Sequence, residues 1–306
     1  MAGFVHVLAR AAAFVLIILT GYQLKRKHFF RPDDFYLISK IVLQVTLPCA
    51  IISNFSQISM EKSLLFMCAL GIGGNMLMSA LGYLLFCRGG RGERAFAMIN
   101  LSGYNIGNFT LPFVQSFLGP VGFAATSLFD AGNTVMCTGF TYMAASVAAG
   151  RKDGTSAKGM LKSLFSSLPF DVYLIMTVLS LCRISLPDIV LFYTGTVGNA
   201  NTFLALFMLG IGFEIHMEKE KLAKLGRILI VRYGAGILLA LLVYHVLPFA
   251  LEVRQAMALA ALGPVSGVAP AFTGKLGGDV ELSSAINSVS ILCSVVLITA
   301  ALLILL

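Results

Sequence analysis

Residues 104–112, YNIGNFTLP, place two asparagines, a glycine and a proline inside a strongly apolar part of the chain. Proline interrupts a helix because it lacks a backbone N–H and its ring clashes with the preceding turn. Residues 263–270, GPVSGVAP, form a similar interruption that also ends in proline. Gly119 and Gly277 follow the two prolines at the same distance. The sequence therefore predicts two interrupted helices, one in each half of the chain.

The composition is that of an integral membrane protein. Of the 306 residues, 58% are hydrophobic and 12% are charged, whereas about 25% of the residues of a soluble domain are charged. A membrane-spanning helix needs about 20 mostly apolar residues. We predict an all-α protein with ten such spans, approximately at residues 4–24, 35–54, 63–87, 93–118, 121–148, 166–185, 189–212, 225–248, 253–276 and 281–306.

The basic residues predict the orientation of these spans. Most Lys and Arg residues lie in connections after odd-numbered spans, and the connections after even-numbered spans hold only Lys62, Arg183 and Arg254. Basic loops stay on the cytoplasmic side. We therefore expect both termini outside the cell membrane and a cytoplasmic link at residues 150–165. The net charge of +8 indicates contact with membrane lipid headgroups and gives no reason to expect nucleic acid.

Five spans precede this link and five follow it. An odd number of spans in each half turns the second half upside down relative to the first, as in many secondary transporters. We therefore predict two inverted five-helix repeats, residues 1–149 and 166–306, with the interruptions in the fourth and ninth spans.

The interruptions predict a binding site. Unwound backbone at membrane depth survives only if it is packed in protein or lines a wet cavity. We expect half-helices to begin near Thr110 and Ala271, with amino ends suited to an anion. The side chains of Asn105, Asn108 and Ser266 would orient the ligand without adding net charge.

Three charged residues lie within the spans or near their ends. Asp130 lies deep in the fifth span, where a carboxylate is functional by default; it would be a proton acceptor, a cation ligand or a structural hydrogen-bond acceptor. Its expected partner is Asn133, one helical turn away. Arg232 and Glu214 lie close enough to pair, and we interpret them as anchors at the membrane surface.

The interruptions also resemble a known family. The stretch NIGNFTLPFVQSFLG is similar to the crossover segment of auxin efflux carriers, and APAFTGKLGGD resembles its counterpart in their second half. The second and seventh spans also resemble those of the family, although Thr110 stands where it usually has glycine. The resemblance implies the sodium/proton-antiporter-like (NhaA-like) fold, in which the broken fourth and ninth helices cross. It also implies a scaffold domain of spans one, two, six and seven and a transport domain of spans three to five and eight to ten.

Together these features predict a secondary active transporter of small organic anions, such as malate, malonate or auxin-like acids, that works by an elevator-type movement. Asp130 is the candidate for proton coupling. A sodium-coupled symporter, a cation/proton antiporter of the same fold and a non-transporting sensor are the alternatives.

No enzyme motif is present, and the scattered cysteines and histidines predict no metal or cofactor. A homodimer is a further expectation from relatives. The expected substrate-binding residues are Asn105, Asn108, Thr110, Asn133, Ser266, Gly267 and Asn287, and the crossover residues are Gly107, Pro112, Gly263 and Pro270.

Overall fold

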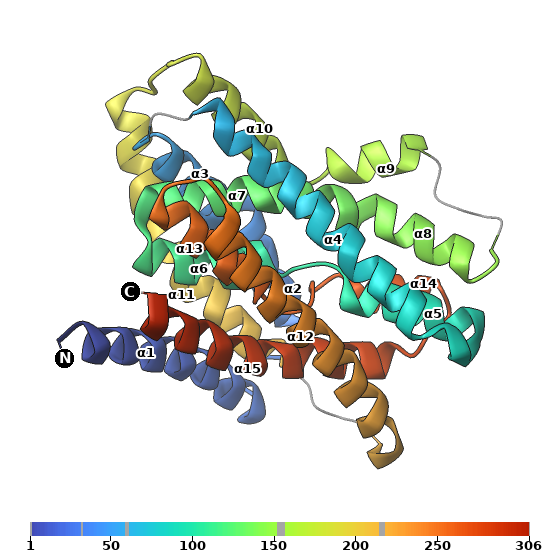
Figure 1. Ribbon diagram of the computed structural model, residues 1–306. Coiled ribbons are helices and arrows are strands. Elements are labelled where there is room, and N and C mark those ends of the chain that lie inside the picture. Colours follow the sequence, from blue (N-terminus) through green and yellow to red (C-terminus); the bar gives the residue numbers. More distant parts are fainter. Residues whose placement is uncertain (1, 32, 59–60, 152–156, 214–217, 306) are drawn as a thin grey trace.

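The chain folds into a bundle of helices. The computed structural model describes residues 2–31, 33–58, 61–151, 157–213 and 218–305. All named elements in these residues are helical, which confirms the predicted all-α class, and their single β-type contact is a bridge between Tyr104 and Val265. The start of α1 (Ala2–Arg26) and the end of α15 (Val280–Leu305) lie on the same side of the molecule, as Figure 1 shows.

Six of the described helices are long and apolar enough to cross a membrane. They correspond to the first, second, third, seventh, eighth and tenth predicted spans. The second is continuous through a π-helical turn at Val42–Thr46. The six are α1, the run of α2 (Asp34–Ile41) through α3 (Leu47–Phe55), α4 (Phe66–Leu85), α11 (Asp188–Ile211), α12 (Leu222–Val246) and α15.

The other four predicted spans are not among these six helices. The sixth is α10 (Leu168–Leu181). The fifth runs without a gap through α7 (Gly119–Val135), a π-helical turn and α8 (Thr141–Ala148), and it is less apolar because it carries Asp130 and Asn133. The fourth consists of α5 (Gly90–Leu101) and α6 (Leu111–Phe117), and the ninth consists of α13 (Leu251–Ala261) and α14 (Ala269–Lys275).

The predicted link at residues 150–165 contains a further helix, α9 (Ala157–Leu164), which the sequence analysis did not predict. Residues 152–156 of the link lie outside the described residues. Four basic residues and several glycines and serines in this segment favoured a polar loop, but the helix begins at Ala157 and includes two of these basic residues, Lys158 and Lys162.

Proline and glycine delimit both half-helices. Pro112 and Pro270 lie in the first turns of α6 and α14. The missing N–H of Pro270 costs nothing because first-turn N–H groups have no partner within the helix, whereas α6 continues from a π-helical turn at Ile106–Thr110. Gly119 and Gly277 follow the half-helices with φ angles of 65° and 64°. Such positive angles are readily adopted by glycine and often end a helix. The spacing seen in the sequence thus reflects two helical segments of the same construction.

Glycines also bring neighbouring helices into close contact. A Cβ atom placed on Gly71 of α4 would lie 2.2 Å from the carbonyl oxygen of Phe129 in α7, and one on Gly132 of α7 would lie 2.0 Å from that of Cys68 in α4. Small residues allow this close approach of membrane helices, where apolar surfaces have no hydrophobic drive to associate. The result fixes the fifth predicted span against the third.

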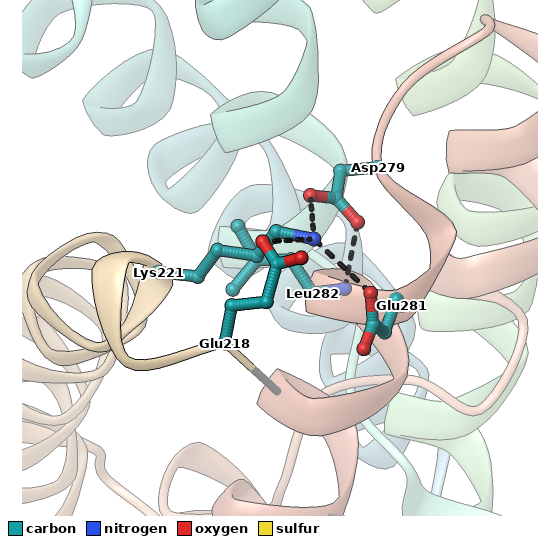
Figure 2. Close-up of polar contacts among 5 residues, drawn as sticks. All are labelled: Glu218, Lys221, Asp279, Glu281 and Leu282. Carbon is teal, nitrogen blue, oxygen red and sulfur yellow. Dashed lines mark hydrogen bonds and ion pairs between the residues drawn. The ribbon is translucent and has the colours of Figure 1, made fainter. Parts of the chain in front are cut away.

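An ion cluster joins the beginnings of α12 and α15 (Figure 2). The ammonium of Lys221 lies 3.1 Å from carboxylate oxygens of Asp279 and Glu281 and 3.7 Å from one of Glu218. Partial burial alone would raise the pKa of Asp279, but hydrogen bonds from the Leu282 backbone N–H and from Lys221 outweigh it and hold that pKa below its ordinary value. The cluster therefore favours the ionised carboxylate in the folded protein.

Candidate functional site

The two interruptions meet inside the bundle. Between α5 and the turn that leads into α6, Tyr104 pairs with Val265 in an antiparallel bridge. The backbone N–H of Asn105 donates to the carbonyl oxygen of Pro264 at 2.9 Å. Gly103 has a φ angle of 78°, and a Cβ atom there would lie 2.8 Å from the Cβ atom of Ser266. The two unwound segments thus touch backbone to backbone, and we call this contact the crossing.

Two asparagines bind the backbone of the first interruption. The Nδ2 group of Asn133 donates to the carbonyl oxygen of Tyr104 at 2.8 Å, and its Oδ1 atom accepts the N–H of Tyr104 at 2.9 Å. Asn75 of α4 accepts the N–H of Gly103 at 2.7 Å and donates to Asn133 at 3.1 Å. These side chains replace the partners that a continuous helix or sheet would supply.

The second interruption is held in a similar way by α15. The Nδ2 group of Asn287 donates to the carbonyl oxygen of Val265 at 2.8 Å, and the N–H of Val265 donates to Ser290 at 3.0 Å. Ser294 donates to the carbonyl oxygen of Leu262 at 2.7 Å. Each bridge residue is therefore bound on both backbone groups by the helix that ends its own half of the chain.

Arg232 of α12 lies at the crossing itself. Its guanidinium donates to the carbonyl oxygens of Leu101, Gly263 and Pro264, the last two at 2.9 and 3.0 Å. Its Cζ atom lies 4.7 Å from the centre of the Tyr104 ring. The side chain is only 1% exposed.

The predicted anchoring of Arg232 at the membrane surface is therefore wrong. The proposed pairing with Glu214 falls on a residue outside the described residues. Arg232 lies about three helical turns into α12, and its depth in the predicted eighth span was the signal that could have identified it. Ionisable residues at such positions face the protein interior and are functional by default.

Asp130 contacts two side chains. Its Oδ1 atom accepts from Asn133 at 2.9 Å, and its Oδ2 atom accepts from the hydroxyl of Tyr173 at 3.0 Å. A Cβ atom on Gly107 would lie 3.5 Å from Oδ2, so the carboxylate also borders the first interruption. The sequence analysis predicted the contact with Asn133, but it missed Tyr173 because nothing in the sequence pairs α10 with α7.

The remaining predicted residues differ in how they are placed. The Oδ1 atom of Asn108 and the Oγ1 atom of Thr110 are buried without a hydrogen-bond partner in the described part of the chain. A Cβ atom on Gly263 would lie 2.9 Å from that Thr110 oxygen. Asn105 is buried, and Gly267 is exposed at the end of the second interruption.

Ser266 lines a narrow crevice beside the crossing. Its walls also include Gly103, Cys137 and Thr141, together with aromatic side chains of α8 and α14. Among the described residues, no group of three or more His, Cys, Asp or Glu side chains lies close enough to hold a metal ion. The site therefore offers amides, hydroxyls, one buried carboxylate and one buried guanidinium.

One protein family matches nearly the whole chain. The profile of the membrane transport protein family, which comprises the auxin efflux carriers, matches residues 6–302, nearly the whole chain. The chain belongs to this family. No curated protein matches the chain. Members of the family are transporters and not enzymes, and the chain is accordingly a multi-pass membrane transporter of the auxin efflux carrier kind.

Proposed function

We propose that the chain is a secondary active transporter of small organic anions that binds its substrate at the crossing. The observation that carries this proposal is the meeting of two unwound, hydrogen-bonded segments beside the buried guanidinium of Arg232. Unwound backbone of this kind forms the substrate sites of many carriers. A carboxylate suits the site because Arg232 places a positive charge at the crossing and the hydroxyl of Thr110, which has no partner among the described residues, can donate a hydrogen bond.

The proposal includes ten spans in two inverted repeats, residues 1–149 and 166–306, with the NhaA-like crossing of spans four and nine. It is supported by the equivalent contacts of Asn133 and Asn287, whose amides donate to Tyr104 and Val265 at the same distance, 2.8 Å. Both half-helices also begin with proline and end with glycine. Two unrelated helix kinks would not be expected to have equivalent hydrogen-bond partners.

An elevator-type movement would carry spans three to five and eight to ten past spans one, two, six and seven. The side-chain partners described above for the two interruptions come from α4, α7, α12 and α15, which all belong to the proposed transport domain. The crossing can therefore move as one unit with its hydrogen bonds intact. Contacts to the proposed scaffold include Tyr173 with Asp130 and Thr202 with Gln115.

The residues at the crossing then divide by role. Asn105, Asn108, Thr110, Ser266 and Gly267 would contact the substrate. Asn133 and Asn287, predicted as substrate ligands, would instead hold the bridge, because their amides already bind backbone. Gly107, Pro112, Gly263 and Pro270 would shape the crossing, and Asp130 would exchange the coupling proton. Both termini would lie outside the cell membrane.

Uptake into liposomes tests this function. Purified protein is reconstituted, and the uptake of labelled malate, malonate and indole acetate is measured with and without a pH or sodium gradient. We expect uptake of at least one of these anions, driven by the pH gradient. Saturable binding without flux would favour a sensor, and dependence on a sodium gradient would favour a symporter.

The variant Asp130→Asn tests proton coupling. We expect it to bind substrate and to lose the effect of the pH gradient on uptake, because an amide cannot exchange a proton. Asp171→Asn is a matched control, since Asp171 lies in the first turn of α10 and makes no contact with the crossing. An unchanged response to the gradient in Asp130→Asn would assign Asp130 a structural role.

A further inference from the structure

We propose that Arg232 is a tethered cation that occupies a cation site formed by the backbone of the crossing, so that no sodium ion or other free metal cation binds there. This inference deepens the proposed function, because it concerns which ion accompanies the substrate. It rests on the positions of three carbonyl groups and of the charges around them.

The three carbonyls come from the carboxyl ends of two broken helices. Leu101 is the last residue of α5, and Gly263 and Pro264 follow the end of α13. The last carbonyls of a helix have no partner within it and carry partial negative charge. The carbonyl of Leu101 is of this kind, and the same guanidinium also binds the carbonyls of the unwound residues Gly263 and Pro264. In cation-coupled carriers, unwound carbonyls and half-helix carboxyl ends are the groups that coordinate the ion.

The charge of Arg232 is not neutralised by an acid. Within the described residues, no carboxylate forms an ion pair with it, and its Nε atom is buried without a partner. The face of the Tyr104 ring, 4.7 Å away, is the other stabilising group, through a cation–π contact. Arginine keeps its proton in proteins, so a full positive charge stays within the crossing.

Arg232 affects substrate binding through the backbone of the crossing and does not contact the substrate. It is too deeply buried to contact a ligand in the crevice. Gly263 lies next to both residues: its carbonyl accepts from Arg232, and the unpartnered oxygen of Thr110 lies 2.9 Å from the position that a Cβ atom on Gly263 would take. Arg232 is therefore a positioning residue, which orders the crossing and supplies the field that favours an anion. A free cation would have to bind the same oxygens and is excluded while the guanidinium occupies them.

The first test measures stability and needs no substrate. Thermal denaturation in detergent is followed by size-exclusion chromatography of the heated protein, in sodium, potassium, choline or guanidinium chloride at equal ionic strength. Wild-type protein should melt at the same temperature in sodium as in choline. Arg232→Ala should melt several degrees lower in choline and should regain part of this loss in millimolar guanidinium or sodium. Stabilisation of the wild type by sodium relative to choline would overturn the proposal.

Arg254→Ala is the matched control. Arg254 also donates to a backbone carbonyl, that of Tyr244 at 3.2 Å, and its Cζ atom lies 5.6 Å from the Tyr244 ring. It is half-buried and lies at the beginning of α13, away from the crossing. We expect no rescue of this variant by guanidinium or sodium. Equal rescue of both variants would mean that the salts act generally on the protein, and the proposal would fail.

Arg232→Lys covers the case in which Arg232→Ala does not fold. Its ammonium keeps the charge and can still donate to carbonyl groups, so it should fold and remain insensitive to sodium. A sodium-stabilised Arg232→Lys protein would count against the proposal. If Arg232→Ala folds but neither guanidinium nor sodium restores its stability, the carbonyls do not form a cation site and the proposal is refuted.

Transport provides the second readout. Uptake of labelled malate should fall about tenfold or more in Arg232→Ala, because the carbonyls of Leu101 and Gly263 lose the guanidinium donor and that of Pro264 keeps only the Asn105 N–H, and guanidinium should restore part of it. If the wild type transports none of the three anions but shows the expected pattern of melting temperatures, the proposed function fails while this inference stands. If malate uptake by the wild type requires sodium, the inference fails while the carrier function stands.

Discussion

Replacing Asn133 by alanine should destabilise the protein far more than a comparable change elsewhere. The side chain makes hydrogen bonds to both backbone groups of Tyr104, to Asp130 and to Asn75. Hydrogen bonds between membrane helices contribute about 0.6 kcal/mol on average and up to about 1.7 kcal/mol. Asn133→Ala also leaves the N–H and the carbonyl of Tyr104 buried without a partner, at about 1–3 kcal/mol for each such group. The two backbone groups of Tyr104 alone therefore predict a loss of about 2–6 kcal/mol.

Asn54→Ala is the control for this substitution. Asn54 is 6% exposed and Asn133 is 4% exposed, so the two changes remove similar buried volume. The Asn54 amide donates to the carbonyl oxygen of Ala50 in its own helix, and its removal should cost about 0.6 kcal/mol. The fraction of protein that remains monodisperse after heating should accordingly fall at a clearly lower temperature for Asn133→Ala.

The comparison has a definite point of failure. If both variants lose the same amount of stability, the bridge at Tyr104 does not depend on the Asn133 amide, and the argument that side chains hold the crossing is refuted. A further loss in the double variant Asn133→Ala with Asn287→Ala, close to the sum of the single losses, would mean that the two interruptions are held independently. We expect the double variant to lose less than that sum, because both amides support the same bridge.

Three further predictions concern other parts of the molecule. Tyr173→Phe removes the donor to Asp130 across the proposed domain boundary and should speed exchange of labelled malate up to about fivefold, the equivalent of about 1 kcal/mol; slower exchange would assign the hydroxyl to the transport step itself. Gly132→Ala should cost about 1–3 kcal/mol in thermal stability because its Cβ atom would meet backbone, whereas Gly73→Ala, with nothing within 4 Å, should cost nothing. The lowered pKa of Asp279 means that its stabilising effect is present above the ordinary carboxyl pKa of about 4 and is lost as the pH falls through its lower folded value, so Asp279→Asn should flatten the acid branch of the melting-temperature profile.

Local signals in the sequence were sufficient to locate the interruptions. Proline and glycine act through their own backbone geometry, so Pro112 and Gly119 mark the half-helix wherever it packs. The limits of the long helices also follow from local composition. The contact between Asp130 and Asn133 could be predicted because residues three apart share a helix face.

The partners of the interruptions could not be found in this way. Arg232 and Tyr173 reach the site from helices far away in the sequence. Tyr173 resembles an ordinary residue of a membrane helix, and Arg232 was interpreted as a surface anchor. Asn75 follows a glycine-rich stretch that indicates close packing, which hid its role. The unwound backbone of an interruption still requires hydrogen-bond donors and acceptors. A search for polar residues at the same depth in the other spans would therefore have identified Arg232 in the eighth span.

The contacts also form a continuous chain from the proposed scaffold to the crossing. The Tyr173 hydroxyl donates to one carboxylate oxygen of Asp130, Asn133 donates to the other, and Asn133 holds Tyr104, which is bridged to Val265. An ionised Asp130 accepts both donors at once. A proton on the Asn133 side opposes an amide N–H that cannot accept, and a proton on the Tyr173 side replaces a charge-assisted hydrogen bond by a weaker neutral one. Protonation on one side would weaken the contact with the proposed scaffold and free the transport domain to move, and on the other it would loosen the bridge at the substrate site. Protonation of Asp130 would thus affect either the movement of the proposed transport domain or the binding of substrate, through atoms that are already in contact. Proton coupling by Asp130 requires such a connection.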